Sequence, residues 1–131
     1  MKIALKYYGL TLLWALFIFI LCSIKMGNVG HSPLFFPGFD KITHCGLFFV
    51  LVVLYCTGYI KKRGPANLNL AICVIIIIAA FIYGGTIELL QAYVFTWRSG
   101  EWSDLFADTL GASMAIFSVY LTLLAIKNVK A

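Results

Sequence analysis

The sequence predicts an all-α fold, a bundle of four transmembrane helices in a single domain over residues 1–131. The composition is the first reason, because mean hydropathy is +0.99 and charged residues make up only 11% of the chain, where soluble domains carry about 25%. The second is that four apolar runs are each long enough to cross a bilayer, which takes about 20 helical residues. The third is that the stretches between these runs are too short to hold a soluble domain.

The four predicted spans cover residues 7–24, 42–60, 68–95 and 103–126. The first could be mistaken for a cleavable signal peptide, because Lys2 and Lys6 precede it. It has full spanning length and no A-x-A-like cleavage site follows it, so we expect a retained helix. In the fourth span, Ala107, Gly111 and Ala115 form a stripe of small residues that predicts a helix-packing seam.

The basic residues predict how the bundle is oriented in the membrane. Seven of the ten lysines and arginines fall before the first span, between the second and third, or after the fourth: Lys2, Lys6, Lys61, Lys62, Arg63, Lys127 and Lys130. By the positive-inside rule, both termini are then cytoplasmic, an N-in/C-in arrangement. The net charge of +5 therefore follows from topology. No nucleic-acid partner is expected, because the basic clusters are short and lie next to the membrane.

The acidic residues gather at the opposite end of the predicted spans. All five lie there: Asp40, Glu88, Glu101, Asp104 and Asp108. At about 1.5 Å per helical residue, His44, Glu88 and Asp108 are about 26, 30 and 28 Å from the cytoplasmic ends of their helices. Three helices therefore bring polar groups to one level near the outer interface.

Each of the last three spans carries a polar pair on one helix face: Asp40 with His44, Glu88 with Gln91, and Asp104 with Asp108. Residues three or four positions apart share a face of a helix. An ionisable residue at membrane depth costs a few kcal/mol unless it faces the bundle interior or water. These pairs therefore mark a candidate functional site.

Three motifs resemble those of the VanZ-like family. They are D-K-x-x-H in "DKITHCGLFF", E-x-x-Q in "IELLQAYVFTWR", and R followed by D-L-x-x-x-x-x-G-A in "RSGEWSDLFADTLGA". The resemblance covers roughly residues 40–112, and the first span by position only. It marks Asp40, Lys41, His44, Glu88, Gln91, Arg98, Asp104 and Gly111. It implies a small multi-pass protein of the bacterial cytoplasmic membrane and cell envelope, in a family named for a member associated with teicoplanin tolerance and without an assigned reaction.

One position departs from the pattern of the family. Many relatives have Asn where this chain has Asp108, in "LFADTLGA". A role that needs a neutral amide would not fit this chain. The extra carboxylate favours proton or metal binding instead.

Two interpretations fit the ionisable residues of the second and third spans. In the first, His44 is a general base oriented by Asp40, and Glu88 beside Gln91 is a catalytic acid or base. In the second, the same residues form buried hydrogen bonds that hold the helices together, each worth about 0.6 to 2 kcal/mol. The sequence leaves both open.

The remaining charged residues also allow two readings. Arg98 and Lys41 can grip a phosphate or carboxylate, with Gln91 and Asp108 as further ligand contacts, or they can serve as counter-ions of the acidic residues. Asp104 either orients the catalytic groups or stabilises the N-terminus of its helix.

No metal or other cofactor is expected. His44, Asp40, Glu88 and Asp104 could ligate a metal chemically, but no H-E-x-x-H or cysteine-pair spacing supports zinc.

The sequence thus predicts an outward-facing polar pocket formed by the last three spans. We expect it to bind or modify an amphipathic envelope molecule, such as a lipid-linked wall precursor, a lipid headgroup or a glycopeptide, among the surrounding membrane lipids. The alternative is a non-enzymatic accessory or partner subunit whose polar cluster is structural. A proton-coupled transporter is disfavoured because the inner half of every span is almost purely apolar. Whether the chain is an enzyme, and its oligomeric state, stay open.

Overall fold

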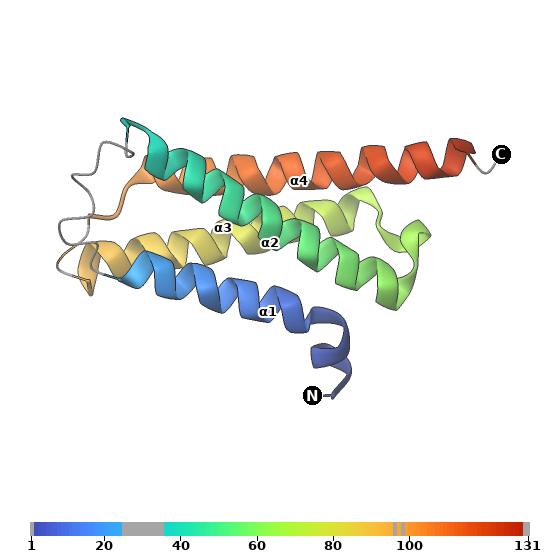
Figure 1. Ribbon diagram of the computed structural model, residues 1–131, viewed down its shortest axis with the longest axis horizontal. Helices are drawn as coiled ribbons and strands as arrows, with labels where there is room; N and C mark the ends of the chain where they lie inside the picture. The colour runs from blue at the N-terminus through green and yellow to red at the C-terminus, as the bar shows by residue number, and fades with distance from the viewer. Residues whose placement is uncertain (1, 25–35, 96, 98, 130–131) are drawn as a thin grey trace.

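The computed structural model describes residues 2–24, 36–95, 97 and 99–129. Its elements are α1 (Lys2–Ser23), α2 (Phe39–Arg63), the short 3₁₀ helix η2 (Pro65–Asn67), α3 (Leu70–Tyr93) and α4 (Trp102–Val129). The predicted all-α fold is confirmed, and the described residues contain no strand. Each of the four α-helices is long and apolar enough to cross a membrane. Figure 1 shows them as one elongated bundle.

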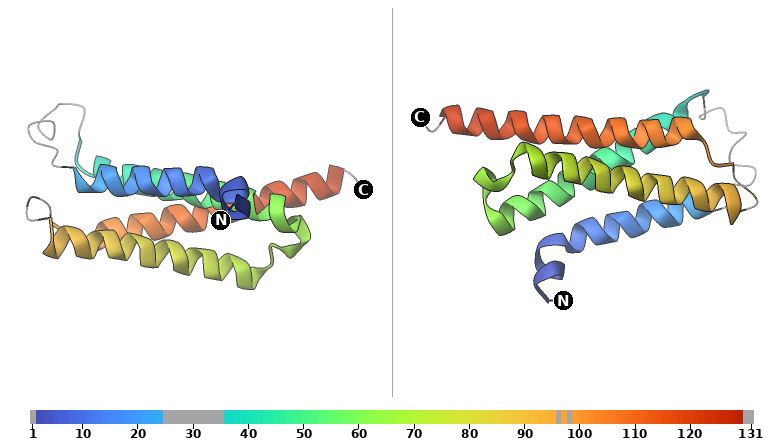
Figure 2. Two further views of the ribbon diagram at one scale, coloured as in Figure 1. Left: turned by 90° about the horizontal axis from the view of Figure 1, so that it is seen from below. Right: turned by 180° about the vertical axis from the view of Figure 1, so that it is seen from behind.

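Consecutive helices run in opposite directions along the bundle, as Figures 1 and 2 show. Helix α2 has its most extensive contacts with α4, while α1 packs on α2 and α3 packs on α4. The ends of α1 and α3 and the beginnings of α2 and α4 therefore meet at one end of the bundle, which we call the acidic end because Asp40, Glu88 and Asp104 lie there. Lys61, Lys62 and Arg63, in the last turn of α2, lie at the opposite end.

A seam of small residues allows α2 and α4 to approach closely. Ala107, Gly111 and Ala115 are buried, as their spacing predicts. A Cβ atom on Gly111 would overlap the backbone carbonyl oxygen of Cys45 on α2. Only glycine fits this contact, because any side chain would push the two helices apart.

The turn before α2 determines where the polar residues of this helix lie. Gly38 has a φ of 88°, in the left-handed region that favours glycine. Helix α2 then begins at Phe39, three residues before the predicted start. Asp40 and Lys41 therefore occupy its first turn, where a carboxylate interacts favourably with the helix dipole.

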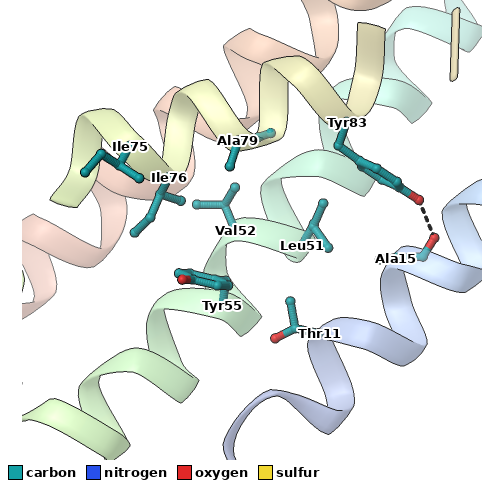
Figure 3. Close-up of a pocket in the computed structure, with 10 residues that line it drawn as sticks. Thr11, Ala15, Leu51, Val52, Tyr55, Ile75, Ile76, Ala79 and Tyr83 are labelled. Atoms are coloured by element: carbon teal, nitrogen blue, oxygen red, sulfur yellow. Dashed lines mark hydrogen bonds between the residues drawn. The ribbon is translucent and has the colours of Figure 1, made fainter. Parts of the chain in front are cut away.

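The middle of the bundle contains an apolar cavity that is separate from the polar residues. Its volume is about 190 Å³, and it is lined by α1, α2 and α3, including Leu51, Val52 and Ile76. Figure 3 shows the Tyr83 hydroxyl at its edge, donating a hydrogen bond of 2.6 Å to the carbonyl oxygen of Ala15. The outer faces of all four helices expose large apolar side chains, as lipid-facing helices do.

Candidate functional site

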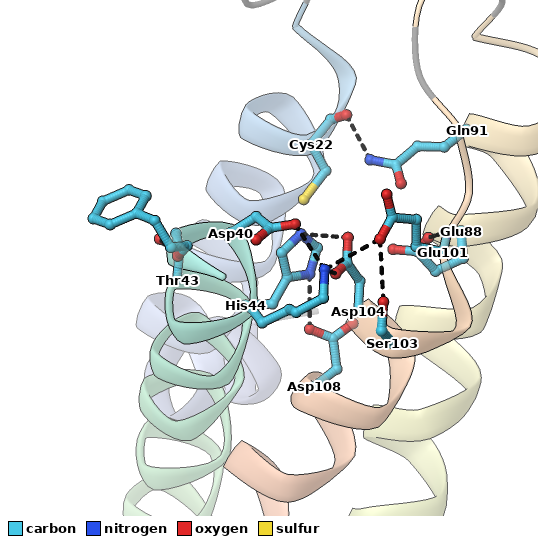
Figure 4. A network of polar contacts seen from close by, with 12 residues as sticks. Cys22, Asp40, Thr43, His44, Glu88, Gln91, Glu101, Ser103, Asp104 and Asp108 are labelled. Atoms are coloured by element: carbon cyan, nitrogen blue, oxygen red, sulfur yellow. Dashed lines mark hydrogen bonds and ion pairs between the residues drawn. The ribbon is translucent and has the colours of Figure 1, made fainter. Parts of the chain in front are cut away.

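The centre of the polar cluster is a histidine between two carboxylates. His44 Nδ1 lies 3.0 Å from Asp108 Oδ1, and His44 Nε2 lies 3.8 Å from Asp104 Oδ2. The two aspartates are one turn apart on α4, so they meet the imidazole of α2 at both of its nitrogens (Figure 4). The side chains of His44, Asp104 and Asp108 are only 6%, 7% and 1% exposed. This group can hold or transfer a proton away from bulk water.

Helix α3 contributes Glu88 to the same cluster. Its Oε2 accepts a hydrogen bond of 2.7 Å from the backbone N–H of Glu101. Its Oε1 is buried and has no hydrogen-bond partner within the described part of the chain. A carboxylate oxygen of Glu88, an imidazole nitrogen of His44 and a carboxylate oxygen of Asp108 all lie within 4.8 Å of one another. Three helices therefore converge on one small polar volume.

Lys41 forms a second, more exposed layer above this buried group. Its ammonium donates to Asp40 at 2.9 Å, to Glu101 at 3.1 Å and to Asp104 at 3.2 Å. The Lys41 side chain is 38% exposed, so solvent screens these ion pairs. Asp104 links the two layers, because one of its oxygens faces Lys41 and the other faces His44.

Gln91 lies at the acidic end too, but its hydrogen bond points away from the polar cluster. It is 1% exposed, and its amide Nε2 donates a hydrogen bond of 2.9 Å to the carbonyl oxygen of Cys22. Figure 4 shows this bond running from α3 to α1, away from the imidazole. Gln91 therefore connects α3 to the helix that contributes no charged residue to the cluster.

The structure brings most of the predicted site residues together. Six of the eight lie in the two layers just described: Asp40, Lys41, His44, Glu88, Asp104 and Asp108. Gln91 stands apart, and Arg98 lies outside the described residues. Asp40 contacts Lys41, while the carboxylates that contact His44 are those of Asp104 and Asp108.

Sequence reasoning did not select Glu101 as a site residue. It precedes α4, and its side chain contacts Lys41 while its backbone N–H binds Glu88. Its position among the five acidic residues was the available signal. Its backbone role has no signal in the sequence, because every residue except proline supplies an N–H group.

Two glycines allow the helices to close around the cluster. A Cβ atom on Gly84 would lie 2.6 Å from Asp108 Oδ2, and one on Gly100 would lie 2.5 Å from the carbonyl oxygen of Glu88. Both distances are shorter than real Cβ contacts. Side chains at these positions would displace the carboxylate or the loop that carries Glu101.

Two grooves reach the cluster from the lipid-facing sides of the bundle. The groove between α2 and α4 has a volume of about 550 Å³, with Lys41 and Ser103 at the acidic end and apolar residues as far as Met114. The groove between α3 and α4 has a volume of about 310 Å³, with Glu88 and Glu101 as its charged residues. Both volumes are in the range of small-molecule sites, about 300–1,000 Å³.

Comparison with known proteins places this architecture in a family. An uncharacterised protein of the fission yeast Schizosaccharomyces pombe is 30% identical over 102 residues, which are 76% of this chain and 58% of that protein. This chain thus spans less than two thirds of the length of that relative. No solved structure matches. The sequence model of the VanZ/LLP1 family matches residues 5–124, nearly the whole bundle and every residue of the two polar layers, so the chain is a member of the VanZ/LLP1 family.

Proposed function

We propose that this membrane protein binds a phosphate-bearing lipid at its acidic end, with the lipid tail in the groove between α2 and α4 and the headgroup at the polar cluster. The observation that carries the proposal is this groove, because it joins a lipid-facing apolar wall directly to Lys41 and Ser103. A ligand with one apolar and one polar part fits such a surface.

Charge selects this groove over its neighbour. The groove between α3 and α4 has Glu88 and Glu101 as its charged lining, which would repel an anionic headgroup. The groove between α2 and α4 has Lys41 instead. Three carboxylates contact the Lys41 ammonium, so a phosphate must replace some of these contacts, whereas the lining of the other groove offers it no cation.

The length of the groove fits one leaflet of a bilayer. From Ser103 to Met114 the groove follows α4 for about 16 Å, at about 1.5 Å per residue. A bilayer has a hydrocarbon thickness of about 30 Å, so one leaflet is about 15 Å thick. With both termini in the cytoplasm of a bacterial cell, this leaflet is the outer one.

The range of organisms favours a phospholipid among the candidate ligands. The family resemblance implies a bacterial cell for this chain, and the similar chain comes from a fission yeast. A lipid-linked peptidoglycan precursor is not common to these two kinds of cell. Phospholipids are present in both. The shared chemistry of the two candidate ligands is a phosphate attached to a long apolar tail.

The buried layer is suited to act on the bound headgroup. His44 lies between Asp104 and Asp108, an arrangement that orients an imidazole for proton transfer. In this proposal His44 and Glu88 exchange protons with the headgroup and Asp104 orients His44. The family resemblance extends the proposal to tolerance of teicoplanin, which the survival of a deletion strain on that antibiotic tests.

Lipid capture provides the direct test. The purified full chain is incubated separately with phosphatidylglycerol and with undecaprenyl pyrophosphate, and the retained lipid is measured by native mass spectrometry. Gly46→Leu should lower retention at least tenfold, because Gly46 lines the groove and a Cβ atom there meets nothing within 4 Å. The new side chain therefore starts in open space and occupies the groove.

Gly9→Leu is the matched control for this experiment. A Cβ atom on Gly9 also meets nothing within 4 Å, but Gly9 is on α1 and outside the groove. It should retain lipid like the wild type. Equal retention by Gly46→Leu and the wild type would contradict the proposal, and the two lipid arms separate a phospholipid from a wall precursor.

A structural role for the cluster is the second candidate function. The contact of His44 with Asp108 joins α2 to α4, and that of Gln91 with Cys22 joins α3 to α1. The chain would then act as an accessory or partner subunit without chemistry. Glu88→Gln would in that case reduce the amount of folded protein in the membrane, whereas a binding role predicts normal protein levels with reduced lipid retention.

A further inference from the structure

We propose that the buried layer of the polar cluster is a binding site for a divalent transition-metal ion, ligated by His44 of α2, Glu88 of α3 and Asp108 of α4. One ligand atom from each residue lies within 4.8 Å of the other two. All three residues are buried. Metal binding deepens the proposed function, since the ion would meet the same headgroup and would replace proton exchange by His44 and Glu88 as the chemistry of the buried layer. It can be tested without any lipid.

The unpartnered oxygen of Glu88 points to a missing ligand. Glu88 is 7% exposed, and its Oε1 has no hydrogen-bond partner among the described residues. A buried carboxylate oxygen without a partner is unfavourable. Its other oxygen is fixed by the backbone N–H of Glu101, so the carboxylate is already oriented as metal-ligating carboxylates are.

The charge balance of the buried layer also favours a cation. Glu88, Asp104 and Asp108 are three buried carboxyl groups around one imidazole. With all four groups charged, negative charges outnumber the positive one by two, and the ammonium of Lys41, which contacts Asp104, is shared with Asp40 and Glu101. Buried charges are usually paired or coordinate a metal, and a divalent ion supplies the missing charge.

The more exposed acidic residues form a useful contrast. Asp40, Glu101 and Asp104 also lie close enough together to hold a metal. The ammonium of Lys41, however, already contacts all three carboxylates. We therefore assign the ion to the buried layer, which has no lysine or arginine contact at Glu88 or Asp108 within the described ranges.

The distances are close to those of a coordinated ion. Ligands about 2.0–2.2 Å from a tetrahedral zinc ion are about 3.4 Å apart. His44 Nδ1 and Asp108 Oδ1 are 3.0 Å apart, and the full set lies within 4.8 Å. Side-chain shifts of about 1 Å would complete the site, within the freedom of unligated side chains.

The surroundings of the imidazole match a known pattern for metal ligands. A histidine that ligates through one nitrogen usually donates its other N–H to a carboxylate, which fixes the ring. Here Nε2 of His44 faces Asp104 Oδ2 at 3.8 Å. Asp104 is in turn held by Lys41. If the imidazole ligates the ion through Nδ1, Asp104 orients the ring at its other nitrogen, Nε2.

The donor set determines the class of ion. One imidazole nitrogen and two carboxylate oxygens suit Zn²⁺ or Mn²⁺, whereas Ca²⁺ requires six to eight oxygen ligands. Three protein ligands leave at least one position open. In this proposal a phosphate oxygen of the lipid takes that position. The ion would supply positive charge that Lys41, engaged by three carboxylates, provides only in part.

Sequence motifs could not reveal this site. H-E-x-x-H places two ligands on one helix, whereas here each of three helices supplies one. The expectation of no metal followed from the absence of such a motif. The juxtaposition of α2, α3 and α4 is what brings the ligands together.

Metal titration of the full chain tests the inference. The purified protein is stripped with a chelator, and binding of Zn²⁺, Mn²⁺ and Ca²⁺ is measured separately by calorimetry, with the metal content determined after dialysis. We expect one Zn²⁺ or Mn²⁺ per chain and no comparable binding of Ca²⁺. His44→Gln, Glu88→Gln and Asp108→Asn should each weaken binding more than about 100-fold, and Asp104→Asn about 10- to 100-fold.

Glu101→Gln is the matched control. It removes a carboxylate from the exposed layer and keeps the backbone N–H that holds Glu88, so metal affinity should stay within about threefold. No stoichiometric binding by the wild type, or unchanged binding in all three ligand variants, would overturn the inference.

If the ligand variants do not fold, the absorption spectrum of the Co²⁺-substituted wild-type protein tests the metal site instead. An absorption spectrum typical of Co²⁺ with nitrogen and oxygen ligands supports the site. A spectrum typical of Co²⁺ with thiolate ligands, or no absorption by bound Co²⁺, contradicts it. If the protein binds zinc but retains no lipid, the proposed lipid-binding function is wrong and the metal site stands. If it retains lipid but binds no zinc, the metal site is wrong and the lipid-binding function stands.

Discussion

At the scale of single residues, the sequence predicts which side chains matter better than it predicts their partners. Spacing along each helix placed His44, Glu88 and Asp108 at one level, and the structure brings them within 4.8 Å. It pairs His44 with Asp108 rather than with Asp40. Spacing within a helix fixes which face a residue is on, but the partner depends on how far the neighbouring helix is rotated, which α2 alone does not determine.

The bond from Gln91 to the carbonyl oxygen of Cys22 leads to a prediction at this scale. Gln91→Leu removes this interhelical bond, so the free energy of unfolding should fall by about 0.6 to 2 kcal/mol. Denaturation with sodium dodecyl sulfate, followed by circular dichroism, measures the change. Thr86→Val is the control, because Thr86 bonds only within its own helix, to Ile82. If both variants unfold with the same free energy as the wild type, the bond from Gln91 to Cys22 does not stabilise the bundle.

At the scale of helices, α2 and α4 form the rigid part of the site. They share the most extensive interface in the bundle, and they carry both the imidazole and the two aspartates that flank it. The seam of small residues on α4 was readable from its spacing. The early start of α2 was not, because it depends on the left-handed conformation of Gly38, which brings Asp40 and Lys41 into the first turn.

Two glycines near the α2–α4 interface offer a matched comparison. Gly111→Ala places a Cβ atom against the carbonyl oxygen of Cys45, and overpacking of this kind costs about 1–3 kcal/mol. Gly46→Ala meets nothing within 4 Å, and alanine is favoured over glycine in a helix by about 0.5–1 kcal/mol. Unfolding in sodium dodecyl sulfate should therefore show a loss of stability for the first and no loss for the second. Comparable values for both would mean that the helices separate easily at this point.

At the scale of the whole molecule, charge divides the bundle into two ends. Lys61, Lys62 and Arg63 end α2, while the described acidic residues lie at the other end. Composition and run length were sufficient to predict the four-helix fold, because the bilayer allows few other solutions. They could not give the grooves beside α4, which depend on how the helices pack.

Reporter fusions test the orientation that this division predicts. Green fluorescent protein at either terminus should fluoresce, and alkaline phosphatase at either terminus should be inactive, because both ends are expected in the cytoplasm. Replacement of Lys61, Lys62 and Arg63 by glutamine should lower this preference and give a mixture of orientations. Strong phosphatase activity at a terminus of the wild type would show the opposite orientation.

The attachment of α1 has a consequence for how the sequence can change over time. Hydrogen bonds from Tyr83, Gln91 and Trp97 all end on backbone carbonyls of α1, at Ala15, Cys22 and Ser23. A carbonyl group is present whatever the side chain is. Substitutions among the lipid-facing residues of α1 can therefore accumulate while these bonds remain. In a mutational scan, the donors on and after α3 should tolerate far fewer replacements than exposed α1 positions such as Leu13 and Leu16.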